Sequence, residues 1–168
     1  MLHYAFEFLD EKADEHTAAR SLLTRLARER LGGSYTVDKK NGVPYLVSED
    51  GGCLYASVTH TDGLCAVAIS DSCVGIDAER VRALERYGEI SKRLLREECL
   101  DGLDAFFIRW TLAEAEYKAY CSDKTGSEKK PLASYLADSA LRGWEKTTKT
   151  EKLTDGEREF YLSVVSGV

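Results

Sequence analysis

Two acidic side chains share one face of a predicted strand, where they could act as paired oxygen ligands or as a charged pair. In the segment Val74–Glu79, apolar residues alternate with Asp77 and Glu79. Strand alternation places these two carboxylates on the same face, roughly 7 Å apart along the chain. Aspartate is depleted in strands. The pair therefore indicates either a functional site or a solvated face with salt bridges to Arg80 and Arg82.

A third carboxylate, Glu114, lies on the apolar side of a helix predicted over Leu103–Cys121. At 100° per residue the apolar arc contains Leu103, Phe106, Phe107, Trp110, Tyr117 and Cys121. Glu114 falls inside this arc, whereas Glu116 falls on the opposite, polar face. A carboxylate on an apolar face is costly unless it is paired or bound to a cation. Glu114 is therefore either an ordinary i,i+4 partner of Lys118 or a ligand of a bound cation.

His60 ends a predicted strand and is flanked by Thr59 and Thr61, just before an Asp-Gly turn. A histidine there is either a structural residue beside an apolar face or a contact to a phosphate group.

The elements that must position these residues alternate between strands and helices. Period-two patterns and turn residues predict strands over Leu2–Leu9, Tyr35–Asp38, Tyr45–Val47, Leu54–Thr61, Leu64–Ser70, Cys73–Arg80, Ser134–Leu141 and Phe160–Ser166. Helical spacing of apolar residues predicts helices over Glu15–Leu31, Tyr87–Glu98 and Leu103–Cys121. This order predicts an α+β fold built from two α+β halves, 1–71 and 72–168, that meet near Asp71.

The composition narrows the function classes. A net charge of -6 over 168 residues, with a pI near 5.2, argues against a nucleic-acid binder, which needs a broad basic surface. Five cysteines without a C-x-x-C pair argue against a zinc or disulfide framework. The longest apolar run, Leu64–Ile69, is too short for a membrane span, and no signal-peptide core follows Met1. The sequence therefore predicts a cytoplasmic protein with reduced thiols and no membrane partner.

Several segments, taken in order, resemble the 4′-phosphopantetheinyl transferases of the surfactin-synthetase-activating type. Val58–Gly63 resembles the S-H-S segment of that family, Val74–Glu79 its G-I-D-x-E strand, and Trp110–Lys118 its W-x-x-K-E-x-x-x-K helix. Arg20–Leu23 and Gly42–Tyr45 resemble two segments nearer the N-terminus. With gaps, the match runs from about Arg20 to the end of the chain.

The resemblance implies a monomeric pseudo-dimer of two similar α+β halves, with coenzyme A in the cleft between them. The implied reaction is Mg²⁺-dependent transfer of phosphopantetheine from coenzyme A to a serine of an acyl or peptidyl carrier protein, releasing 3′,5′-ADP. By the same resemblance, Asp77, Glu79 and Glu114 would bind Mg²⁺, which takes oxygen ligands and shares them with phosphates. Asp77, Glu114 and Lys118 would form the catalytic set, with Glu114 as the base and Lys118 on a phosphate.

On the nucleotide side, the resemblance implies that Thr59 and His60 contact the ribose 3′-phosphate, with Ser21 nearby. The chain departs from the family at Val43 and at Ala113, where a lysine is usual. Lys39 and Lys40 lie close enough in sequence to compensate for Val43, and Lys40 is expected to bind coenzyme A.

The basic segment Arg80–Arg96 is expected to face the carrier protein, because such carriers are typically acidic around their serine. Two alternatives remain open on the residues. One is a related protein that binds coenzyme A or a carrier without turnover. The other is an Mg²⁺-dependent hydrolase of phosphate compounds.

Overall fold

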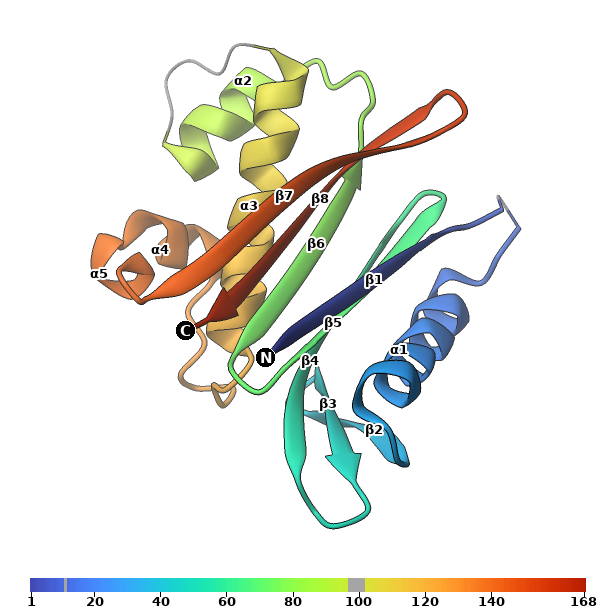
Figure 1. Cartoon of the computed structure of the whole chain (residues 1–168). Helices are drawn as coiled ribbons and strands as arrows, with labels where there is room; N and C mark the ends of the chain where they lie inside the picture. Colours follow the sequence, from blue (N-terminus) through green and yellow to red (C-terminus); the bar gives the residue numbers. More distant parts are fainter. Residues whose placement is uncertain (11, 97–101) are drawn as a thin grey trace.

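The chain has a mixed α+β fold, seen in a computed structural model that describes residues 1–10, 12–96 and 102–168. Within these residues the strands form a five-stranded and a three-stranded sheet. Each sheet carries a long helix on its outer side (Figure 1). None of the helices in the described ranges is long and apolar enough to cross a membrane.

The five-stranded sheet is formed by residues 2–70 and is antiparallel between the paired strands. Its strands are β1 (Leu2–Phe8), β2 (Tyr35–Lys40), β3 (Val43–Ser48), β4 (Cys53–Thr61) and β5 (Leu64–Ser70), in the spatial order β1-β5-β4-β3-β2. Asn41 and Gly42, between β2 and β3, have φ of 52° and 81°, as a two-residue hairpin turn of type I′ requires. The strands predicted over Leu54–Thr61 and Leu64–Ser70 are confirmed and pair as β4 and β5 across the Asp-Gly turn.

Helix α1 (Glu15–Leu31) covers the outer face of this sheet and has the bounds that the sequence predicts. Asp14 caps its first turn by accepting hydrogen bonds from the backbone N–H groups of His16 and Thr17. Its buried side, which includes Leu22, Leu23 and Leu26, packs against apolar residues of the sheet.

The three-stranded sheet pairs β6 (Val74–Arg80) and β7 (Lys146–Asp155) with a central β8 (Arg158–Gly167). The core between the two sheets is made by alternate residues of their facing strands: Leu64, Ala66, Ala68, Val74, Ile76, Ala78, Phe160, Leu162 and Val164. The predicted apolar face of β6 is therefore confirmed. The two sheets are also joined by a hydrogen bond, because Ile76 N–H donates to Ser57 Oγ at 3.1 Å.

Helix α3 (Leu103–Cys121) covers the outer face of the three-stranded sheet, again with the predicted bounds. It lies against β6 at Gly75, where a Cβ atom would stand 1.9 Å from the Ala115 carbonyl oxygen and 2.5 Å from Ala119 N. Only a residue without a side chain permits this approach. Gly75 therefore allows α3 to lie close enough to β6 for side chains of the two elements to make contact.

Two predicted elements are wrong or incomplete. The segment Ser134–Leu141, expected as a strand, forms α4 (Leu132–Ala137) and α5 (Ser139–Arg142), and the side chain of Asp138 caps α5. The helix expected over Tyr87–Glu98 consists of α2 (Tyr87–Ile90) and a π-helical turn, η1 (Ser91–Leu95). Arg96, which follows, has a left-handed φ of 56° and is not helical. The last two residues of that prediction, 97 and 98, lie outside the described residues, as does Cys99. The described cysteines, Cys53, Cys65, Cys73 and Cys121, are free.

Glu116 is buried, contrary to the prediction that it lies on a polar face of the helix. Its carboxylate accepts hydrogen bonds from Tyr135 Oη at 2.8 Å and Arg142 Nε at 3.0 Å, and pairs with Lys146 Nζ at 3.0 Å. The short helices α4 and α5 and the start of β7 supply these partners. The helix wheel missed them because it contains no information on which elements cover the helix.

Candidate functional site

Asp77 lies where β6, β4 and α3 meet, and it is almost fully buried. Its Oδ1 accepts a hydrogen bond from Lys118 Nζ at 2.7 Å and one from Thr59 Oγ1 at 3.2 Å. The Lys118 ammonium also donates to the carbonyl oxygen of Ile76 at 3.1 Å. Lys118 therefore pairs with Asp77 rather than with Glu114, the i,i+4 partner that the sequence suggested.

The second carboxylate oxygen of Asp77, Oδ2, is buried and has no hydrogen-bond partner among the described residues. A buried oxygen without a donor is costly, by about 1–3 kcal/mol for a neutral group and more for a charged one. Burial accordingly raises the pKa of Asp77, against the attraction of Lys118 and the hydrogen bond from Thr59. This oxygen is suited to accept a hydrogen bond from a bound ligand or to bind a cation.

Glu79 and Glu114 lie close enough to Asp77 to feel its negative charge. Burial raises the pKa of both glutamates, and the negative charge of Asp77 raises each further. Arg82, a hydrogen bond with Trp110 and Lys118 oppose the shift at Glu79, and Lys118 opposes it at Glu114. The three acidic residues singled out in the sequence thus lie near enough to repel one another.

This donor set suits a hard divalent cation, which prefers carboxylate oxygens. The lone Asp77 Oδ2 and the mutual repulsion of the carboxylates fit such an ion. Among the residues that the structure describes, however, no three His, Cys, Asp or Glu side chains converge as a ready-made metal site. The Lys118 ammonium already occupies Asp77 Oδ1, so Oδ2, Glu79 and Glu114 are the groups left to bind a cation.

His60 lies on the opposite face of β4 from Thr59, as strand alternation requires. Its Nδ1 is 2.9 Å from Glu15 Oε2, and its ring lies 4.4 Å from the ring of His16. A cavity of about 780 Å³ opens beside it, lined by His16, Thr17, Ala19, Arg20, Leu23, Val37, Asp38, Lys39, Gly42, Pro44, Val58 and His60. Arg20 and Lys39 bring positive charge to this cavity, and Asp38 brings a negative charge.

The other residues expected on the nucleotide side are spread out. Thr59 points away from His60 and donates to Asp77 instead. Ser21 is exposed on α1 and lines neither this cavity nor the two described next. His16 was not singled out in the sequence, although it precedes Arg20 by one helical turn and so shares its face of α1.

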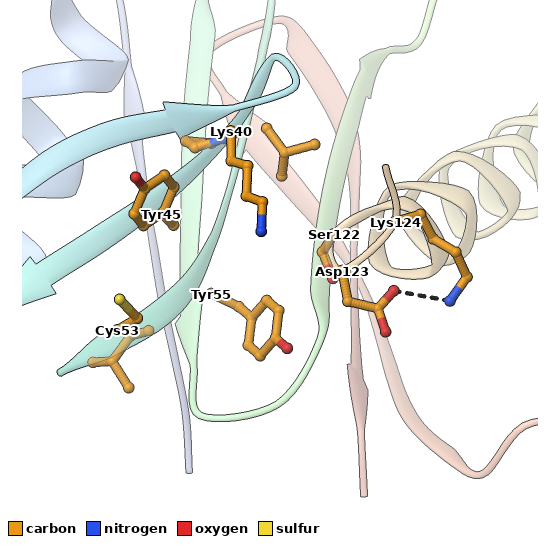
Figure 2. A pocket seen from close by; sticks show the side chains of 10 residues that line it. Lys40, Tyr45, Cys53, Tyr55, Ser122, Asp123 and Lys124 are labelled. Atoms are coloured by element: carbon orange, nitrogen blue, oxygen red, sulfur yellow. Dashed lines mark hydrogen bonds and ion pairs between the residues drawn. The ribbon is translucent and has the colours of Figure 1, made fainter. Parts of the chain in front are cut away.

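Lys40 lines a second cavity, of about 400 Å³, between β2–β4 and the end of α3 (Figure 2). Lys40 and Tyr55 extend toward the turn that holds Ser122, Asp123 and Lys124, and Lys124 Nζ pairs with Asp123 at 3.0 Å. Lys39 and Lys40, neighbours in sequence, therefore face different cavities.

A third cavity, of about 290 Å³, is lined by residues of both halves of the chain. Its lining is formed by Gly42, Val43, Pro44, Ala56, Ser57, Val58, Val74, Tyr117, Lys118, Cys121 and Lys129. Pro44 lines all three cavities, and Val43 and Gly42 each line two. The three cavities therefore share residues at the start of β3, and Lys118, which lines the third, also contacts Asp77.

Ala113, where the resembled family usually has a lysine, is covered by α4. It is 4% exposed and packs in the cluster of Tyr135 and Leu136 from α4. A lysine at this position would have to displace these side chains to reach the cleft.

The pKa shifts on α3 predict opposite stability effects for two nearby glutamates. The raised pKa of Glu114 means that the folded state holds its proton more tightly than the unfolded state does. The stability of the fold therefore falls as the pH rises from the unfolded-state pKa through the folded-state pKa. At pH 7 we expect Glu114→Gln to raise the melting temperature by a few degrees. The gain should disappear below about pH 4, where both states are protonated.

Glu116→Gln is the matched control on the same helix. Burial favours the neutral form of Glu116, but hydrogen bonds from Arg142, Tyr135 and Lys146 outweigh it and lower the pKa. Its carboxylate therefore stabilises the fold above the unfolded-state pKa, and the glutamine variant should melt lower at pH 7. Thermal melts of both variants between pH 3 and pH 8 check the pair; shifts of the same sign would contradict the assignment.

Compared with protein-family models and with curated proteins, the sequence gives no significant match.

Proposed function

We propose that the chain is an Mg²⁺-dependent 4′-phosphopantetheinyl transferase that modifies a serine of an acyl or peptidyl carrier protein. The observation that supports this most is the lone Oδ2 of Asp77, buried beside Glu79, Glu114 and Lys118. Basic residues line each of the three cavities that share Pro44: Lys40 and Lys124 the first, Arg20 and Lys39 the second, and Lys118 and Lys129 the third.

The arrangement of the two halves agrees with this proposal. Each half packs one long helix, α1 or α3, on the outer face of an antiparallel sheet (Figure 1). We take these halves as the two units of a pseudo-dimer, in a chain that acts as a monomer. Coenzyme A would then bind between the units.

In this function Asp77, Glu79 and Glu114 would hold Mg²⁺. The bound ion would supply positive charge to offset the charge on the phosphoryl oxygens. Lys118 would donate to a phosphate oxygen through the proton of its ammonium that Asp77 and Ile76 leave available. His60, held by Glu15, would bind the ribose 3′-phosphate together with Arg20.

Glu114 is the candidate base for the carrier serine. Its raised pKa brings it closer to the range in which a carboxylate accepts a proton at neutral pH. The serine oxygen would form a bond to the β-phosphorus while the bond from that phosphorus to the bridging oxygen breaks. The products are the phosphopantetheinyl serine and 3′,5′-ADP, and the serine proton passes to Glu114.

Mass spectrometry of an apo carrier protein incubated with the chain, coenzyme A and Mg²⁺ tests this function. We expect the carrier to gain the mass of phosphopantetheine, and excess EDTA to prevent the gain. Release of phosphate without a carrier adduct would indicate a hydrolase. Binding of coenzyme A without either product would indicate a protein that has lost turnover.

The carrier surface is proposed to be the segment Arg80–Arg96, which holds six basic and two acidic residues. Arg86 and Arg93 flank one hollow of this surface, although Glu89 neutralises part of the charge of Arg86. Reversing both charges to glutamate should raise the KM for the carrier about tenfold at low salt and leave the KM for coenzyme A unchanged. The difference should shrink as salt rises.

The control is the same double reversal at Arg28 and Arg30, exposed residues of α1 on the other half of the molecule. Both double variants change the net charge equally. Equal carrier kinetics in the two double variants, at low salt, would count against a docking surface at Arg86 and Arg93.

A further inference from the structure

Lys129 belongs to the segment between α3 and α4, yet it reaches the hairpin turn of the first half. Its Nζ donates a hydrogen bond to the carbonyl oxygen of Asn41 at 3.1 Å. Its side chain lines the cavity of about 290 Å³ that Lys118 and Val43 also line. Lys118 of α3 and Lys129 of the following segment thus both line this cavity.

The two ammonium groups have unused hydrogen-bond donors. A lysine ammonium carries three N–H donors. Lys118 uses two of them, on Asp77 and Ile76, and Lys129 uses one on Asn41. Within residues 1–10, 12–96 and 102–168, no carboxylate lies within ion-pairing distance of Lys129 Nζ. Its charge is therefore balanced by no acidic neighbour there.

The remaining lining of the cavity favours an anion with more than one charged oxygen. Val43, Val58 and Val74 are apolar and offer no competing negative charge. Asp77, the acidic neighbour of Lys118, does not line the cavity. A diphosphate presents charged oxygens on two adjacent phosphorus atoms, so it can accept from both lysines at once.

We propose that Lys129 is a diphosphate-binding residue that works together with Lys118, and that it replaces the lysine absent at position 43. That the diphosphate is the one in coenzyme A rests on the proposed function. Lys39 and Lys40, the substitutes that the sequence suggested, line the neighbouring cavities instead. The bond to Asn41 holds the Lys129 ammonium at the turn where Val43 begins β3.

Titration calorimetry with coenzyme A and, separately, with inorganic pyrophosphate tests this role, each in the presence of Mg²⁺. Lys129→Ala should raise the Kd for both ligands about tenfold, the lower end of the loss for a charge-assisted phosphate contact. Lys130→Ala is the control, because it removes the same charge from an exposed neighbour. The backbone oxygen of Lys130, which accepts from Tyr117 Oη, is unaffected. This control should keep the wild-type Kd.

A second variant tests the replacement itself. Val43→Lys in the Lys129→Ala background should restore most of the lost affinity, because it returns a cation to the same cavity. Thermal melts confirm that each variant is folded.

The outcomes separate the inference from the proposed function. Equal losses in the two alanine variants, or a wild-type chain that binds neither ligand, would overturn the role of Lys129. Lys129-dependent binding of pyrophosphate without transfer to any carrier protein would uphold the diphosphate site and overturn the transferase.

Discussion

The Glu114→Gln variant is expected to lose phosphopantetheine transfer by about a thousandfold, while remaining folded. The glutamine keeps the shape of the side chain but can neither take the serine proton nor offer a charged oxygen to Mg²⁺, and a general base alone contributes about 10²–10⁴-fold. Because the same substitution should raise the melting temperature at pH 7, loss of activity cannot be assigned to unfolding. Single-turnover transfer, followed by carrier mass, measures the effect.

Asp77→Asn should show a comparable loss of activity together with weaker Mg²⁺ binding by calorimetry. The variant should remain folded, which a thermal melt checks. Asp104→Asn, an exposed acidic residue at the start of α3, is the control and should retain full transfer. Transfer at the wild-type rate by either site variant, or by the wild-type chain in excess EDTA, would show that these carboxylates do not take part in the reaction.

Gly75→Ala is expected to destabilise the fold by about 3 kcal/mol or more, at the upper end of the range for overpacked cores. The added Cβ would meet the backbone of Ala115 and Ala119, which cannot turn away as a flexible side chain can. Helix α3 would have to move off β6, and Lys118 would leave Asp77 with it. Urea unfolding measures the loss of stability.

Gly126→Ala provides the comparison, because a Cβ at Gly126 meets no atom within 4 Å and its φ is not in the left-handed region. It should stay within about 0.5 kcal/mol of the wild type. If Gly75→Ala were equally mild, the close contact of α3 and β6 would not be what positions the site.

Local periodicity was enough to predict the elements that carry the acidic residues. The two-residue alternation of β6 separates Ile76, which faces the other sheet, from Asp77, which faces Lys118. The bounds of α1 and α3 follow from apolar spacing and from the residues at their ends. These features depend on neighbours within one or two turns, which a single sequence contains.

Features that depend on distant partners were missed. Strand β7 is polar along most of its length and exposed at many positions, so it has no apolar alternation; its pairing with β8 is what makes it a strand. Glu116 is buried because α4 and α5 cover it, which the sequence of α3 alone does not reveal. The choice of Lys118 between Asp77 and Glu114 is likewise decided by the contact of α3 with β6.

The residues of the candidate site likewise divide into those that a local pattern predicts and those that depend on distant partners. The acidic residues could be singled out because a charge on an apolar face or a strand breaks a local pattern, and Lys118 because it lies four residues after Glu114. Lys129 breaks no pattern in its polar segment, and its place beside Val43 depends on the packing of the two halves. His16 likewise becomes a candidate site residue only through its contact with the ring of His60.

The central position of β8 has a consequence for the order in which the chain can fold. Among the residues that the structure describes, strand β6, which carries Asp77 and Glu79, pairs only with β8, the last of these strands along the sequence. The five-stranded sheet, by contrast, is complete within residues 2–70. During synthesis the first half can therefore form its sheet while β6 still lacks a backbone partner. The acidic strand of the candidate site is ordered only after the final hairpin of β7 and β8 emerges.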